Sequence, residues 1–136
     1  MRTSVMAAMM LVAGAVGASA ADMCDSEADC ADAMTTADIV ACNAKATARA
    51  DDALNALWPK VVALYDLNSN ADADKAALRK AQNDWIGFRD ATCSAEGALA
   101  DGGTIAGIYV EDCRCSVTAS RVADFERMIA NRSEGN

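Results

Sequence analysis

Residues 71–93, ADADKAALRKAQNDWIGFRDATC, carry the clearest helical periodicity in the chain. Side chains recur at intervals of three and four residues, at Leu78, Ala81, Trp85, Phe88 and Thr92. This spacing predicts a helix with one buried face. Asp72 or Asp74 is expected to cap its start, because a short carboxylate accepts hydrogen bonds from free amides of the first turn. Trp85 and Phe88 are predicted to be core residues rather than a sugar-stacking platform.

A second helix is predicted upstream, over residues 36–67. Its buried face is expected to carry Leu54, Leu57, Val61 and Leu64. Pro59 lacks the amide that would bond to the carbonyl of Asn55, so we expect a kink or a broken helix there. The polar residues 68–70 predict a turn.

Periodicity is lost from Glu96 to Gly107, where Asp101-Gly102-Gly103 favours a loop with at most one short helical turn. A last helix is expected over residues 111–131, with a frayed end after it. Its face is expected to carry Val117, Arg121, Phe125 and Met128, widened by Val122 and Ile129. The fold class is therefore all-α: a small disulfide-stapled bundle of three main helices, with a loop-rich segment before the last helix.

The first 20 residues have the pattern of a cleavable export signal. They contain Arg2, an apolar run from Val5 to Val16, and the small residues Ala18-Ser19-Ala20. The run is short for a membrane span, and no lipidation signal precedes the first cysteine. We expect residues 1–20 to be a signal peptide and residues 21–136 to form one domain, periplasmic or secreted, without membrane insertion after cleavage. An uncleaved anchor is the alternative.

The chain is acidic, with a net charge of −8, and loss of Arg2 with the signal takes this to −9. Such a surface disfavours nucleic acid and anionic membranes and attracts basic proteins, although the charge alone would also serve solubility. The six cysteines predict disulfides rather than a zinc site, because the chain has no histidine and no CxxC motif. The lack of histidine also removes the common nucleophile arrangements. We expect no catalytic residue, no cofactor and no metal.

Sequence motifs cover nearly all of the chain after the signal. They are Cys30 with Thr35 and Cys42, Asp51-x-x-Leu54-Asn55, Leu78-x-x-Ala81-Gln82-x-x-Trp85-x-x-Phe88-Arg89-Asp90-x-x-Cys93, and Cys113 followed by Thr118-x-x-Arg121. In this combination the chain resembles the lysozyme inhibitor LprI-like family of small exported bacterial domains. It departs from the family in Trp58-Pro59, where the family has a tyrosine and a helix-permissive residue, and in the additional Cys24 and Cys115.

The resemblance implies pairs Cys30–Cys42 and Cys93–Cys113, and leaves Cys24 to pair with Cys115. It also implies a protein-binding function without enzymatic activity, namely inhibition of lysozyme-type muramidases by covering a basic cleft. The partner would be a basic protein such as lysozyme. A non-inhibitory cell-envelope interaction or structural module is the alternative.

Polar residues beside the apolar faces of the helices allow two interpretations. The set is Asp51, Asn55, Gln82, Arg89, Asp90 and Arg121. We interpret it as a structural network, because arginine can bridge helices and a paired network sets helix register in an alanine-rich bundle. A binding site is the alternative.

The segment between Cys93 and Cys113 is the candidate inhibitory surface. Both its ends would be tethered, which lowers the ordering cost of binding. Its carboxylates, expected to meet a basic cleft, are Glu96, Asp101, Glu111 and Asp112. A connection without function is the alternative.

Overall fold

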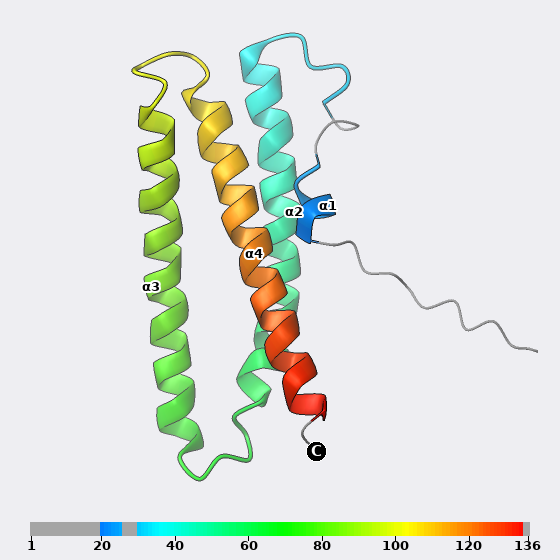
Figure 1. Cartoon of the computed structure of the whole chain (residues 1–136), viewed down its shortest axis with the longest axis vertical. Coiled ribbons are helices and arrows are strands. Elements are labelled where there is room, and N and C mark those ends of the chain that lie inside the picture. Colours follow the sequence, from blue (N-terminus) through cyan, green and yellow to red (C-terminus); the bar gives the residue numbers. More distant parts are fainter. Residues whose placement is uncertain (1–19, 26–29, 135–136) are drawn as a thin grey trace, which may run out of the picture.

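The computed structural model describes residues 20–25 and 30–134, so the expected signal peptide, apart from Ala20, lies outside the described residues. These residues contain four helices: α1 (Ala20–Met23), α2 (Thr36–Ala63), α3 (Ala71–Ala98) and α4 (Ala106–Glu134). The three long ones form a bundle in which α4 lies between α2 and α3 (Figure 1). Helices α2 and α3 both pack on α4 and make few direct contacts with each other. The all-α prediction is confirmed, with no strand in the part described.

Helix α2 begins with a capping box. The Asp38 amide donates to Thr35 Oγ1 over 3.1 Å, and the Thr35 amide donates to Asp38 Oδ2 over 3.0 Å. The helix is not broken at Pro59 and ends at Ala63, short of the predicted residue 67. Val61, fully buried just after the proline, anchors this last turn in the core, which offsets the lost hydrogen bond.

The buried face of α3 differs from the predicted one. Gln82, Cys93 and Gly97 are buried with Leu78, whereas Ala81 is exposed. Phe88 is 60% exposed, so the prediction that it is a core residue is wrong. Because α3 packs mainly on α4, polar and covalent links to that helix decide its rotation: a Gln82–Arg121 hydrogen bond and the Cys93–Cys113 disulfide. Asp72 and Asp74 lie inside the first turn of α3, and Asn70 is the N-cap.

The main core lies where the three long helices meet. Its buried members are Leu54, Val61, Leu78, Val122 and Phe125. Trp58 and Trp85 are partly buried against this cluster. A second cluster, of Ala46, Ala50, Cys115 and the partly buried Cys24, lies between α1, α2 and α4. Alanines there let the helices approach closely.

The connection between α3 and α4 is shorter than predicted. Only residues 99–105 are non-helical, since α3 extends to Ala98 and α4 runs from Ala106 to Glu134 without the early fraying expected. Gly97 lies so close to α4 that an added Cβ would be 2.6 Å from Val110 Cγ2. Glycine at this position therefore serves close helix packing rather than loop freedom. Asp101 and Gly102 make the turn with φ of 46° and 77°.

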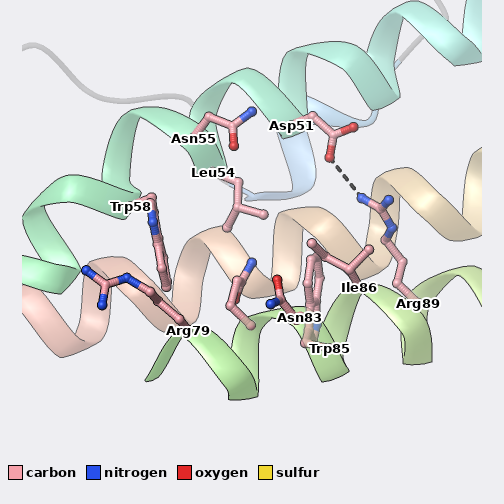
Figure 2. Close-up of a pocket in the computed structure, with 10 residues that line it drawn as sticks. Asp51, Leu54, Asn55, Trp58, Arg79, Asn83, Trp85, Ile86 and Arg89 are labelled. Atoms are coloured by element: carbon pink, nitrogen blue, oxygen red, sulfur yellow. Dashed lines mark hydrogen bonds and ion pairs between the residues drawn. The ribbon is translucent and has the colours of Figure 1, made fainter. Parts of the chain in front are cut away.

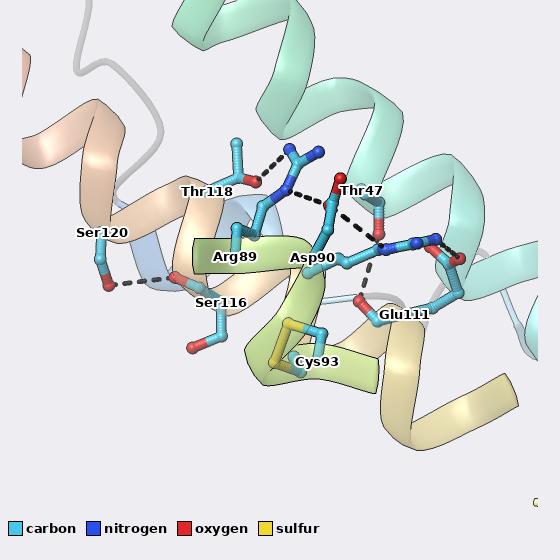
Figure 3. The surroundings of a disulfide bond; sticks show 10 residues. Thr47, Arg89, Asp90, Cys93, Glu111, Ser116, Thr118 and Ser120 are labelled. Atoms are coloured by element: carbon cyan, nitrogen blue, oxygen red, sulfur yellow. Dashed lines mark hydrogen bonds and ion pairs between the residues drawn. A yellow bond between two sulfur atoms is a disulfide. The ribbon is translucent and has the colours of Figure 1, made fainter. Parts of the chain in front are cut away.

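The six cysteines form three disulfides, Cys24–Cys115, Cys30–Cys42 and Cys93–Cys113, the pairs that the family resemblance implies. Their Cα–Cα distances are 5.7, 5.6 and 5.4 Å. The first joins the residue after α1 to α4, the second joins the segment before α2 to that helix, and the third joins α3 to α4 (Figure 3). Each long helix therefore carries a covalent link.

Candidate functional site

Arg89 connects all three long helices. Its Nη1 donates to Asp51 Oδ1 on α2 over 2.9 Å and to Thr118 Oγ1 on α4 over 3.3 Å. Its Nε donates over 3.1 Å to Asp90 Oδ1, on its own helix (Figure 3). The Arg89 side chain is only 15% exposed, so these partners replace most of its hydration.

Arg121 makes the corresponding link between α4 and α3. Its Nε donates to Gln82 Oε1 over 3.1 Å. Its Cζ lies 4.8 Å from the Phe125 ring centroid and 5.7 Å from that of Trp85, and Arg89 Cζ lies 5.5 Å from the Trp85 centroid. The two guanidinium groups therefore hold the Trp85 ring in place by cation–π contacts.

The structure joins five of the six predicted network residues through these contacts. Asn55 is the exception, because it is exposed and has no side-chain hydrogen bond within the described residues. Thr118, fully buried, is a member that the periodicity missed; its only signal is the Thr118-x-x-Arg121 motif. We infer a structural role for the joined residues.

A groove lies between α2 and α3 (Figure 2). Its volume is about 520 Å³. Lining residues include Asp51, Asn55 and Trp58 from α2, and Arg79, Asn83 and Trp85 from α3. The groove exists because α2 and α3 both pack on α4 and make few direct contacts with each other. Arg79 and Asn83 lie outside any apolar stripe, so the sequence pattern did not indicate them.

The four carboxylates predicted to bind a partner fall into two groups. Glu96 and Asp101 are exposed, near the end of α3 and in the following turn. Glu111 and Asp112 lie within α4, and each connects to α2. Glu111 accepts from Arg114 Nη1 over 3.2 Å, and its backbone carbonyl accepts from Thr47 Oγ1 over 3.2 Å.

Asp112 Oδ1 accepts a hydrogen bond from Asn43 Nδ2 over 2.6 Å. Partial burial raises the pKa of Asp112 above its ordinary value, and the adjacent negative charge of Glu111 raises it further. Asp112 therefore has a structural partner, unlike the freely exposed Asp101.

Large apolar side chains are exposed beside Asp101. Leu99 is 79% exposed, and Ile105, at the other end of the same turn, is also exposed. Met34, just before α2, is 88% exposed. The start of α2 and the α3–α4 turn lie at the same end of the bundle (Figure 1). We call Met34, Leu99, Asp101 and Ile105 the loop-end surface.

An apolar hollow of about 650 Å³ adjoins this surface, lined by Val40 and Ala44 of α2 and by Thr104 of the turn. Exposed apolar area with polar residues at its edge is typical of protein-binding surfaces. The carboxylates were predicted from the sequence and the apolar residues were not, although Leu99 and Ile105 within an expected loop were an available signal.

These features define a small disulfide-linked helical domain with surfaces suited to binding another molecule. Residues 26–125 match the family described as Lysozyme inhibitor LprI, and the chain belongs to this family. Membership implies a lysozyme inhibitor role, with lysozyme as the partner. A relative from Rhizobium meliloti (strain 1021), Uncharacterized protein R02472, is 32% identical over 111 residues, which are 76% of this chain and 80% of the relative. No solved structure shows significant similarity to the chain.

Disulfides and family membership together indicate an exported protein. Within residues 20–25 and 30–134, no helix has both the length and the apolar character needed to cross a membrane.

Proposed function

We propose that this protein inhibits a lysozyme-type muramidase by placing its loop-end surface over the basic substrate cleft of the enzyme. The observation that carries the proposal is the exposure of Leu99 and Ile105 on either side of Asp101 at one end of the bundle. It is supported by membership of a family of lysozyme inhibitors.

The loop-end surface is suited to this task because disulfides hold both of the segments that carry it. Cys93–Cys113 joins α3 to α4 below the turn, and Cys30–Cys42 fixes the segment before α2. A surface held in this way loses little conformational freedom on binding. Glu96 and Asp101 would speed encounter with a basic enzyme, while the apolar side chains would slow dissociation. Inhibition then needs binding alone, without catalysis.

We further propose that residues 1–20 are removed on export, and that the protein acts in the periplasm or outside the cell. The three disulfides support an oxidising compartment. Mass spectrometry of the exported protein tests this; a first residue other than Ala21 contradicts the cleavage site.

A cell-wall lysis assay with a basic lysozyme and purified protein tests the inhibition. We expect lysozyme turnover to fall with added protein, less so at high salt because charge screening weakens the encounter. Leu99→Ser with Ile105→Ser should restore turnover, and Ala77→Ser, an exposed position on the far half of α3, is the matched control. Undiminished turnover, with an envelope protein captured instead, would favour the non-inhibitory module.

A further inference from the structure

The groove between α2 and α3 is separate from the loop-end surface and has a different chemical character. Asp51, Arg79 and Arg89 are its charged lining residues. Arg89 is paired with Asp51, so Arg79 is the lining charge without a partner among the described residues, in a chain of net charge −8. A basic protein partner is poorly matched to such a lining. The groove is better matched to a neutral or acidic ligand.

Gln82 is a fixed hydrogen-bond donor in this groove. It is only 9% exposed, and its Oε1 accepts from Arg121 Nε. Because a guanidinium group only donates, this bond directs the amide oxygen toward Arg121 and leaves the amide nitrogen free to donate. That nitrogen has no partner within the described residues, yet it is not closed off from solvent. A ligand in the groove would complete its hydrogen bonding.

Three further polar side chains line the groove without partners of their own. Asn55 on α2 and Asn83 on α3 face the groove from opposite walls, and Arg79 lies near Trp58 (Figure 2). All three are exposed, and none has a side-chain hydrogen bond or ion pair among the residues described. The structural network therefore does not account for them, although Asn55 belongs to one of the sequence motifs.

The apolar walls of the groove are held rigidly. Trp85 is fixed by the guanidinium groups of Arg89 and Arg121, and the Trp58 ring lies 5.8 Å from the Phe125 ring, centroid to centroid. Walls that are already ordered reduce the entropy lost when a ligand binds. The chain contains two tryptophans, and both line this groove.

We propose that this groove binds an oligosaccharide of N-acetylated amino sugars that carries a carboxylate. The side-chain amides of Asn55 and Asn83 can both donate to and accept from hydroxyl and N-acetyl groups, and the Gln82 amide nitrogen donates. Trp58 supplies apolar surface for the C–H face of a sugar ring, while Trp85, whose ring is contacted by the guanidinium groups of Arg89 and Arg121, forms a fixed apolar wall beside it. Arg79 supplies a forked donor for the carboxylate. This site is independent of the proposed inhibition and uses none of its residues.

Intrinsic tryptophan fluorescence tests the proposal, because both tryptophans report on the groove. The purified protein is titrated with two probes in the absence of lysozyme: chitotetraose, which is neutral, and a tetrasaccharide of alternating N-acetylglucosamine and N-acetylmuramic acid, which carries carboxylates. We expect both to change the emission and the acidic probe to bind more tightly. Asn55→Ala and Asn83→Ala should each weaken both probes by about tenfold, the loss expected for a hydrogen bond.

Arg79→Gln should remove the preference for the acidic probe while retaining chitotetraose binding. Lys80→Gln is the matched control on α3, since Lys80 is exposed, pairs with Asp84 and lies outside the groove lining. Thermal melts should be unchanged for the Arg79, Asn55 and Asn83 variants, because these side chains have no structural partner.

Three results would overturn the proposal. One is unchanged emission with both probes at millimolar concentration. Another is equal affinity of the acidic probe for wild type and Arg79→Gln. The third is a combined result: neither glycan binds the wild type, and the double variant Asn55→Ala, Asn83→Ala loses lysozyme inhibition. That result would make the groove a protein interface.

Discussion

Arg89 Nη1 on α3 lies 2.9 Å from Asp51 Oδ1 on α2, and this ion pair spans two helices that otherwise make few direct contacts. The same nitrogen donates to Thr118 on α4. One side chain therefore sets the spacing of α2 and α3 and so the width of the groove between them.

Arg89→Ala should destabilise the protein by about 2 to 4 kcal/mol, because buried Thr118 loses its partner and Asp51 its counter-ion. Arg121→Ala should have a similar effect through Gln82. Thermal and urea unfolding measure both, with exposed Lys80→Ala as the control. Unchanged unfolding with lost inhibition would instead assign these arginines to a binding site.

The two phenylalanines should respond oppositely to the same substitution. Phe125 is fully buried in the main core, so Phe125→Ala should cost about 3 to 5 kcal/mol. Phe88 is mostly exposed, so Phe88→Ala should change the free energy of unfolding by only about 0.5 kcal/mol. Comparable losses in urea unfolding would show that α3 is rotated differently from the described structure.

Non-reducing peptide mapping should recover Cys24–Cys115, Cys30–Cys42 and Cys93–Cys113. Replacing Cys93 and Cys113 with serine opens a loop of sequence separation 20 and should cost about 3 kcal/mol in the chain-entropy model. The same change at Cys24 and Cys115, of separation 91, should cost between 4 and 5 kcal/mol, approximately. A Cys93–Cys115 peptide would contradict the pairing.

Neutralising Asp101 of the loop-end surface together with nearby Glu96 should slow association with lysozyme without affecting the fold. Glu96→Gln with Asp101→Asn removes exposed charges, which contribute little to stability. Association rates measured at low and high salt should be lower and less salt-dependent than in the wild type. Asp112→Asn is unsuitable for testing the association rate, since Asp112 accepts a structural hydrogen bond from Asn43. Equal rates in the double variant and wild type would mean that this end does not meet the enzyme.

Two carboxylates, Asp38 and Asp112, should change the free energy of unfolding in opposite directions as pH falls. Hydrogen bonds from the Thr35 side chain and from the Thr35 and Met34 amides lower the pKa of Asp38 below its ordinary 3.8. The stabilisation that ionised Asp38 gives the folded state is therefore present above pH 3.8 and is lost as pH falls through the folded-state pKa. The pKa of Asp112 is raised, mainly by burial, so its contribution is present below 3.8 and is lost as pH rises through the folded-state value. NMR titration of both carboxyls checks the directions; two shifts of the same sign would contradict the capping box or the burial of Asp112.

The sequence by itself determined the three long helices, the turn at residues 68–70 and the all-α class. Helix formation follows from local spacing and caps, which a linear pattern contains. The family resemblance also supplied the cysteine pairs and most residues of the polar network. Helix ends were less predictable: α3 and α4 continue through a glycine-containing segment because Gly97 packs closely against Val110.

Only the tertiary structure decided which face of α3 is buried. A period of three to four residues fits a stripe through Phe88 as well as one through Gln82 and Cys93, and local sequence cannot choose between them. The choice depends on the partner helix, since Arg121 and Cys113 on α4 draw Gln82 and Cys93 inward and leave Phe88 in solvent. For the same reason the groove and the loop-end surface arise only when distant segments meet, because both depend on how α2 and α3 flank α4.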